Sequence, residues 1–204
     1  MAGGEIWSWL NSDEQYLPET LAIVAAALKS RAAIDFVYGN TLLLRTDGSL
    51  IAFRKAAPLR LIYLRASHLY AHSSSLFVRR RCIADRETWL NPNWRAAGDH
   101  EWMLRLLGQG AKGYRLSCYL SAFFMTGTNL GLTDTGTQEL RRLRSRQPGW
   151  IRLAAPVLRV CRSVEKWLAG GFSQACPLAY RIVDQAGSRV ECRATSVSWR
   201  YRDS

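Results

Sequence analysis

The alternation of apolar and polar positions along the chain predicts both helices and strands. Residues 18–31 repeat apolar positions at helical spacing, with Leu21, Val24 and Leu28 on one face. Short apolar runs bounded by turn residues are typical of buried strands. Such runs predict strands over residues 6–10, 34–38, 76–78 and 114–124. The pattern therefore indicates an α/β protein.

Turn residues divide the apolar segments. Thr46-Asp47-Gly48 separates two of them, and Asp-Gly in that setting predicts a β-hairpin. Gly39-Asn40 is expected to close the strand over 34–38. Residues 85–98 are rich in Trp, Asn, Pro and Gly and predict a loop, which a helix over 100–109 is expected to follow.

The composition changes near Pro148-Gly149, which is typical of a chain break. We therefore expect residues 1–147 to form one domain and residues 148–204 to form a basic appendage, with a helix and a strand-like tail. That helix either lies in a membrane interface or packs on the core with its arginines in solvent. Its apolar stripe consists of Leu153, Val157, Val160, Val164 and Trp167, and the basic residues beside it are Arg152, Arg159, Arg162 and Lys166.

The composition places the chain among ordinary globular proteins, since 48% of its 204 residues are hydrophobic and 22% are charged. No apolar run is long enough to span a membrane, and the N-terminus lacks the features of a signal peptide. We expect a cytoplasmic protein that can attach peripherally to the inner face of the membrane. Zinc is not expected, because the five cysteines include no CxxC pair.

Positive charge is concentrated near the C-terminus. Residues 1–140 carry 15 basic and 12 acidic groups, a net of +3, whereas residues 141–204 carry 13 and 4, a net of +9. This excess indicates an anionic membrane surface, a phosphate-rich ligand or a nucleic acid as partner. Nucleic acid is not expected, because no recognised binding motif is present. Arg79-Arg80-Arg81 is either a solvated face or a phosphate contact.

The acidic turn Asn11-Ser12-Asp13-Glu14 follows the apolar segment over 6–10. Carboxylates just past a sheet strand lie where open α/β sheets bind ligands. Oxygen ligands of this kind suit Mg²⁺ or Mn²⁺ holding phosphates. The alternative is a capped turn whose acids are solvated.

Asp99 is the second candidate, because it follows Gly98 and precedes the helix expected from residue 100. It is either the N-cap of that helix or a carboxylate base held at the helix start. Glu101 then lies in the first turn, where an acid also stabilises the helix dipole. His68 and His72 predict a polar surface or loop pair. Motifs of serine hydrolases, P-loop proteins and dinucleotide-binding proteins are absent from the sequence.

Taken in order, several segments resemble the C-terminal half of a family 2 glycosyltransferase with the GT-A fold. The resemblance covers about residues 4–129. Ile6-Trp7-Ser8-Trp9-Leu10-Asn11-Ser12-Asp13-Glu14 resembles the metal-binding acidic motif with its strand, and Gly98-Asp99-His100-Glu101-Trp102 resembles the segment with the catalytic base. Between them, three segments resemble the next strand, its hairpin and the region beneath the acceptor site: residues 35–40, Asp47-Gly48 and residues 73–80.

The resemblance implies a partial GT-A fold, a mixed sheet with flanking helices. It implies an inverting, metal-dependent enzyme that moves a sugar from a nucleotide diphosphate sugar to the hydroxyl of a glycan or lipid-linked acceptor, in cell-envelope or polysaccharide synthesis. Asp99 would be the catalytic base, and Asp13 would hold Mg²⁺ or Mn²⁺. Asn11 and Glu14 would support the donor and the metal shell, and the acceptor-side candidates are Ser74, Trp102 and Glu101.

Three departures from the family accompany the resemblance. The usual first acidic residue is Asn11 here, and the region in which many members have a metal-binding histidine is residues 123–129. The N-terminal half that holds the nucleotide is absent, so the chain resembles a truncated enzyme. The alternative functions are therefore an inactive remnant and a non-catalytic basic module that binds a membrane surface.

Overall fold

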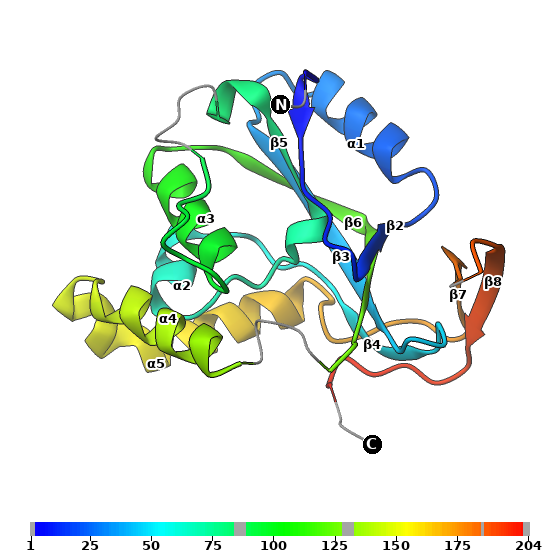
Figure 1. The fold of residues 1–204 in the computed structure, drawn as a ribbon. Helices are drawn as coiled ribbons and strands as arrows, with labels where there is room; N and C mark the ends of the chain where they lie inside the picture. The colour runs from blue at the N-terminus through cyan, green and yellow to red at the C-terminus, as the bar shows by residue number, and fades with distance from the viewer. Residues whose placement is uncertain (1–2, 84–88, 128–132, 185, 202–204) are drawn as a thin grey trace.

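A mixed six-stranded sheet lies at the centre of the protein, with helices on both faces (Figure 1). The computed structural model describes residues 3–83, 89–127, 133–184 and 186–201. The strand order is β1-β5-β3-β6-β2, and β4 pairs with β3. The predicted α/β class is confirmed. The strands are β1 Ile6–Trp7, β2 Glu14–Tyr16, β3 Phe36–Leu44, β4 Leu50–Arg54, β5 Leu76–Arg79 and β6 Gly113–Phe124.

The central strand β3 runs parallel to β6 and antiparallel to β4 and β5. It continues through Gly39 and Asn40, so the predicted strand end there is wrong. A side chain at Gly39 would place its Cβ 2.6 Å from Cδ1 of Leu120, so only glycine allows the two strands to approach. The Asn40 amide donates to the Ser117 carbonyl (2.8 Å) and accepts from the Ala56 N–H (2.9 Å), which supports the irregular pairing.

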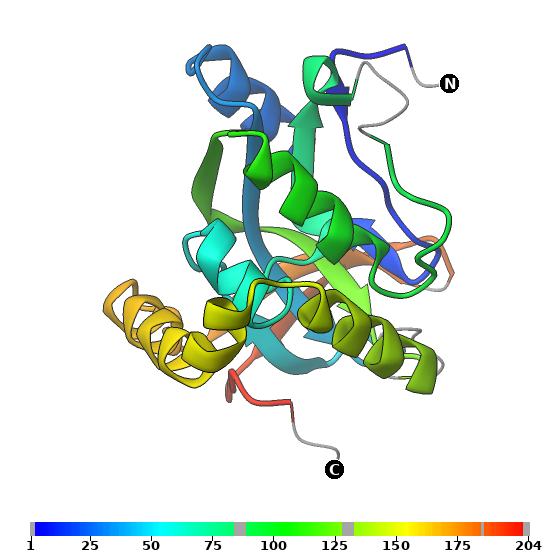
Figure 2. The same ribbon diagram turned by 90° about the vertical axis from the view of Figure 1, so that its left-hand side faces the viewer.

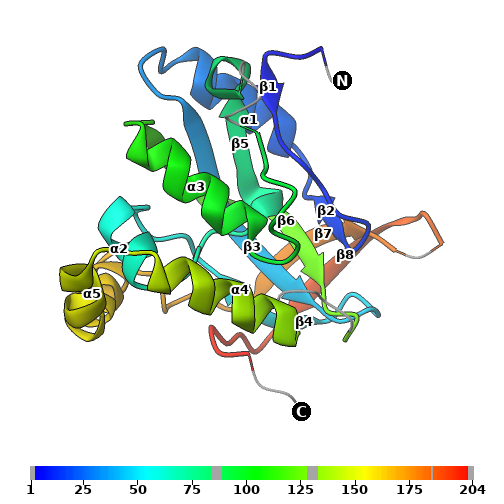
Figure 3. The ribbon, with the colours of Figure 1, turned by 60° about the vertical axis from the view of Figure 1, so that its left-hand side comes forward.

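The two faces of the sheet carry different helices, as Figures 2 and 3 show from two sides. Val37 packs towards α1, while Phe36 and Tyr38 pack towards α2 and α3. This alternation is the expected consequence of the two-residue repeat of a strand. The helices are α1 Thr20–Lys29, α2 Leu61–Ala66 and α3 Gly98–Gly108.

The predicted helices at 18–31 and 100–109 are confirmed as α1 and α3, and the Asp47-Gly48 hairpin is confirmed between β3 and β4. Within α1, Val24 and Leu28 are buried as expected. Leu21 is 61% exposed and lies away from the core, which corrects the predicted apolar face.

The predicted strand over residues 6–10 is mostly wrong. Within this range only the two residues of β1 form a strand, which pairs with β5. Residues 8–11 have no strand structure. The side chains of Trp7 and Trp9 instead pack against Trp102 of α3, with ring centroids 5.3 and 5.6 Å away. The apolar residues of this segment therefore pack on a helix, whereas the pattern predicted that they would form a strand. The acidic turn follows this segment and leads into β2, which pairs with the end of β6.

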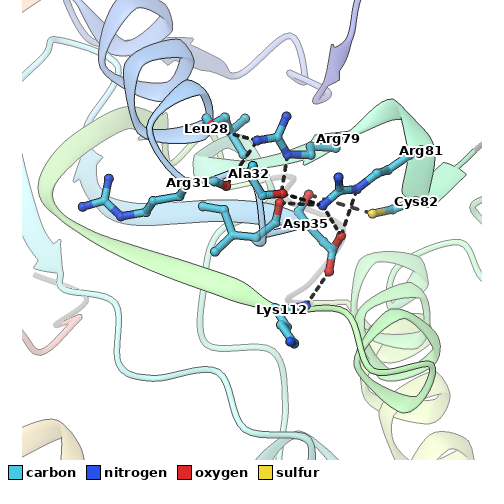
Figure 4. A network of polar contacts seen from close by, with 9 residues as sticks. Leu28, Arg31, Ala32, Asp35, Arg79, Arg81, Cys82 and Lys112 are labelled. Carbon is cyan, nitrogen blue, oxygen red and sulfur yellow. Dashed lines mark hydrogen bonds and ion pairs between the residues drawn. The ribbon is translucent and has the colours of Figure 1, made fainter.

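The arginine run around β5 has a structural role. Arg79 donates to the carbonyl of Leu28 at the end of α1 (2.5 Å), and Arg81 forms an ion pair with Asp35 (2.9 Å; Figure 4). The second carboxylate oxygen of Asp35 accepts from the Lys112 N–H (2.8 Å). These contacts connect the end of α1 to the ends of β3, β5 and β6. Two short 3-10 turns flank β5, at Ser73–Ser75 and Arg80–Ile83.

The C-terminal residues pack against the rest of the chain. Tyr180 and Ile182 join a core cluster that includes Leu42 and Leu44 of β3. The division at residue 148 stays a prediction. Throughout the described ranges, the helices are too short or too polar to cross a bilayer. The C-terminal elements are α4 Asp134–Ser145, α5 Gly149–Leu168, β7 Leu178–Val183 and β8 Arg189–Ala194.

Candidate active site

A cleft with a volume of about 1860 Å³ brings the two candidate motifs together. The turn between β1 and β2 contributes Asn11, Asp13 and Glu14, and the first turn of α3 contributes Asp99. The end of β6 and the loop before residue 73 complete much of the wall. Side chains far apart in sequence thus face a single cavity, which is the usual form of a ligand site.

The acidic turn is closed by reciprocal hydrogen bonds. The Glu14 carboxylate accepts from the Asn11 N–H (2.8 Å), and the Glu14 N–H donates to the Asn11 carbonyl (3.1 Å). The Asp13 carbonyl accepts from the Phe124 N–H (2.8 Å), which fixes the turn beside β6. The alternative of a capped turn with solvated acids is right about the cap, since Glu14 closes the turn. It is wrong about the solvation of Glu14, which is buried.

Glu14 carries an unsatisfied oxygen. Burial raises the pKa of Glu14, and the hydrogen bond from Asn11 only partly offsets this effect. Its Oε1 atom is buried and has no hydrogen-bond partner among the described residues. The nearby Ser74 hydroxyl donates to Ser121 (3.0 Å), and its proximity also lowers the pKa of Glu14. A buried carboxylate oxygen without a donor is costly, so a cation or a proton at this position stabilises the turn.

Asp99 lies inside the first turn of α3, whose N-cap is Ala97, so the N-cap interpretation is wrong. Its carboxylate accepts from the His100 N–H (2.7 Å), which fixes its orientation. Burial raises the pKa of Asp99 to about 6. A carboxylate held in a cleft with a pKa near neutrality has the properties of a general base.

Glu139 of α4 holds the backbone segment that leads into α3. Its carboxylate accepts from the N–H groups of Arg95, Ala96 and Ala97 at 2.8–2.9 Å. Burial raises the pKa of Glu139, but these three hydrogen bonds together bring it below its usual value. Glu139 thereby fixes the position of the segment from which α3 begins.

Replacing Glu139 with alanine should destabilise the protein by about 1–2 kcal/mol, since three N–H groups lose their acceptor. Urea unfolding at neutral pH measures this difference. The difference should disappear as the pH falls through the lowered pKa of Glu139, because a depressed pKa stabilises the fold only above that pH. Glu191→Ala on the exposed strand β8 is the matched control. An equal loss in both variants would contradict this role of Glu139.

The cleft is also lined by polar side chains that sequence reasoning did not assign to it, among them Arg54, His68, His72 and Lys166. Burial lowers the pKa of each histidine to about 4, so both are neutral at pH 7. Burial, followed by the charges of Arg54 and Arg162, lowers the pKa of Lys166 to about 8. Both histidines lie in the loop between α2 and the 3-10 turn at Ser73–Ser75, so the predicted loop pair is confirmed. A half-buried lysine beside arginines favours an anionic ligand.

The acceptor-side candidates lie outside the lining of this cleft. Ser74 and Trp102 are 0% and 1% exposed, so both lie beneath the surface. One Glu101 oxygen accepts from Arg105 (2.8 Å), and the other is buried without a hydrogen-bond partner in the described part of the chain. Their roles towards an acceptor stay predictions. Any such role of Ser74 or Trp102 would act through neighbouring residues.

The acidic turn fits a metal ion only when other ligands complete the site. Across the residues that the structure describes, no three His, Cys, Asp or Glu side chains group as metal ligands. The side chains of Asn11, Asp13 and Glu14 offer oxygen atoms as metal ligands, including the unsatisfied Glu14 oxygen. Proteins often hold Mg²⁺ with one or two carboxylates while substrate phosphates and water complete the shell. The turn suits Mg²⁺ or Mn²⁺ in that manner.

No family model matches this chain, and no curated protein matches its sequence. The functional argument therefore depends on the motif residues and on their arrangement around the cleft.

Proposed function

We propose that this protein acts as an inverting, metal-dependent glycosyltransferase with a partial GT-A fold. The observation that supports the proposal most strongly is that Asp13 and Asp99, candidates from two separate motifs, line the same cleft. The substrates are a nucleotide diphosphate sugar and a glycan or lipid-linked acceptor. The proposed setting is the cytoplasmic face of the membrane, in cell-envelope or polysaccharide synthesis.

In the proposed reaction, Asp99 takes the proton from the acceptor hydroxyl. The acceptor oxygen forms a bond to the anomeric carbon as the bond to the nucleoside diphosphate breaks, on the opposite side of the sugar. The configuration at that carbon is therefore inverted. The pKa of Asp99, about 6, leaves the carboxylate mostly deprotonated at neutral pH yet still basic enough to accept a proton.

The other cleft residues bind and orient the donor. Asp13 would hold Mg²⁺ or Mn²⁺ against the diphosphate, with Asn11 and Glu14 in support. When bound, the ion offsets the negative charge that develops on the leaving group. Arg54 and Lys166, which line the same cleft, supply fixed positive charge for the phosphates.

Replacing Asp13 with alanine should remove the metal dependence of diphosphate binding, because the variant loses the principal carboxylate of the site. Calorimetry would measure the affinity for a nucleotide diphosphate sugar and for inorganic pyrophosphate, with MnCl₂ and with EDTA. Pyrophosphate tests the phosphate site without contributions from the base and ribose. The wild type should bind at least about tenfold more tightly with manganese, a difference of ~1.4 kcal/mol.

Asp134→Ala is the control, because Asp134 is an exposed acid in the first turn of α4. The control should keep the manganese effect. Equal affinity of wild type and Asp13→Ala under both conditions would contradict the metal assignment and leave the turn a structural element.

The alternatives are an inactive remnant of such an enzyme and a non-catalytic basic module on a membrane surface. The apolar exterior of α5 favours the second of these. Transfer of radiolabelled sugar to an acceptor separates the three functions. A remnant retains the cleft without turnover, and a module binds vesicles without any effect of nucleotide sugars.

A further inference from the structure

Helix α5 has apolar residues on two opposite faces. One narrow face, formed by Ile151, Ala155 and Leu158, packs against Ile62 and Ala66 of α2. The other face points away from the protein and exposes large apolar side chains along the helix. We call this face the α5 stripe, and it consists of Trp150, Leu153, Val157, Val160, Val164, Trp167 and Leu168.

The basic residues of α5 do not cover the stripe. Arg159 donates to the Ala66 carbonyl (3.1 Å), and Arg162 donates to the Ser67 hydroxyl (2.8 Å), so both reach the end of α2. The guanidinium of Arg162 also lies over the ring of Tyr70, 5.3 Å from its centroid. The predicted alternative is confirmed in so far as the helix packs on the core, but it does so through the narrow face and not through the stripe. Arg152 and Arg159 stay exposed, and the large apolar residues face outward.

The stripe is too continuous to be a scatter of surface residues. It follows a helix of 20 residues, which is about 30 Å long. Exposure within it ranges from 49% at Val164 to 85% at Leu153. A hollow of about 430 Å³ between α5 and Phe172 adjoins Val160, Val164 and Trp167, and it is almost entirely apolar. Extended apolar surfaces of this kind mark contacts with a membrane or another protein.

We propose that the α5 stripe docks this protein on an anionic membrane surface, with the helix lying in the plane of the interface. Trp150 and Trp167 stand near the two ends of the helix, and tryptophan is enriched where bilayer and water meet. The inference is independent of the proposed sugar transfer, since it depends only on the exterior of α5. A helix of this kind inserts its apolar face without crossing the bilayer.

The charge of α5 indicates which partner the α5 stripe binds. Helix α5 contains four basic residues and one acid, Glu165, which already pairs with Arg60 (2.6 Å). Arg152 is exposed on this helix, and the chain carries a net charge of +12. A second copy brought face to face would present the same positive charge, which repels, whereas anionic headgroups are complementary. The membrane therefore fits the stripe better than a second copy.

Flotation of the 204-residue chain with lipid vesicles tests the proposal. The vesicles are phosphatidylcholine alone and phosphatidylcholine with 30% phosphatidylglycerol, each at about 50 and 500 mM salt. We expect strong flotation with the anionic vesicles at low salt, weakening at high salt. Tryptophan fluorescence should shift to the blue and be quenched by brominated lipid.

The variant Leu153→Asn/Val157→Asn should lower the partition coefficient at least about tenfold, because two inserted side chains become polar. Leu21→Asn, which alters a leucine on α1 that is 61% exposed, is the control and should bind like the wild type. Circular dichroism checks that all variants fold.

Three results would overturn the proposal: no flotation with either vesicle type, equal flotation of the double variant and the wild type, or no salt dependence. Sedimentation equilibrium tests the alternative that the stripe binds a second copy of the chain. A dimer that the double variant converts to a monomer, without vesicle binding by the wild type, would assign the stripe to an interface between copies. Vesicle binding is measured without nucleotide sugar, so its failure is separate from failure of sugar transfer.

Discussion

Asp99→Asn should reduce sugar transfer by about 10²–10⁴-fold, the range expected when a general base is removed. The asparagine keeps the size of the side chain and its ability to accept from the His100 N–H. Only proton acceptance is lost, so donor binding with metal should be unchanged. Asp184→Asn is the matched control, because Asp184 also lines the cleft and accepts backbone N–H bonds.

The pH dependence of the wild type provides a second measurement. Because burial raises the pKa of Asp99 to about 6, kcat/KM should fall about tenfold per pH unit below that value. Near-normal turnover in Asp99→Asn, or a profile without this acid limb, would contradict the assignment.

Stability separates the catalytic role of Asp99 from a structural one. A pKa raised in the folded state means that stability falls as the pH rises from the unfolded pKa of 3.8 to about 6, because the folded state binds more protons in that window. Asp99→Asn should therefore be at least as thermostable as the wild type at pH 7. A clear loss of stability would indicate instead that the charged carboxylate supports the helix.

Trp102→Ala should destabilise the protein by about 3–5 kcal/mol, the usual cost of truncating a large buried aromatic residue. Trp102 is 1% exposed and packs against Trp7 (5.3 Å between ring centroids), so its removal leaves a cavity between α3 and the N-terminal segment. Urea unfolding measures the change in the free energy of unfolding. Trp167→Ala, at a position 67% exposed, is the control and should cost little.

The same position tests the predicted acceptor role of Trp102. Trp102→Phe keeps most of the ring in the core and should preserve folding. If the KM for the acceptor is unchanged in that variant, the indole contributes packing alone. A raised KM with normal stability would instead support a contribution of Trp102 to acceptor binding.

Local patterns predicted the elements whose stability is local. The helical repeat of residues 18–31, the Asp47-Gly48 turn and the apolar run at 76–78 all correspond to observed elements. These signals succeed because helical periodicity and glycine at a positive φ are encoded by neighbours in the chain, and Gly48 has a φ of 86°. The α/β class follows from their sum.

The local sequence pattern did not predict which residues pair as strands. Gly39 and Asn40 resemble a turn, yet they continue β3. The Leu120 side chain of the neighbouring strand fills the space beside Gly39, and the Ser117 carbonyl accepts a hydrogen bond from the Asn40 side chain. Residues 6–10 resemble a strand, yet Trp9 packs on α3. Contacts between distant segments outweighed local preference in both cases.

The sequence by itself determined the two acidic motifs, the amphipathic pattern of α5 and the basic C-terminal region, since these are properties of residue type and spacing. Only the tertiary structure decided that Asp13 and Asp99 share a cleft with His72 and Lys166. It also decided which side of α5 is buried. Periodicity identifies an apolar stripe but not its partner, and small side chains such as Ala155 suffice to pack against α2. The α5 stripe, which has the larger side chains, is therefore exposed.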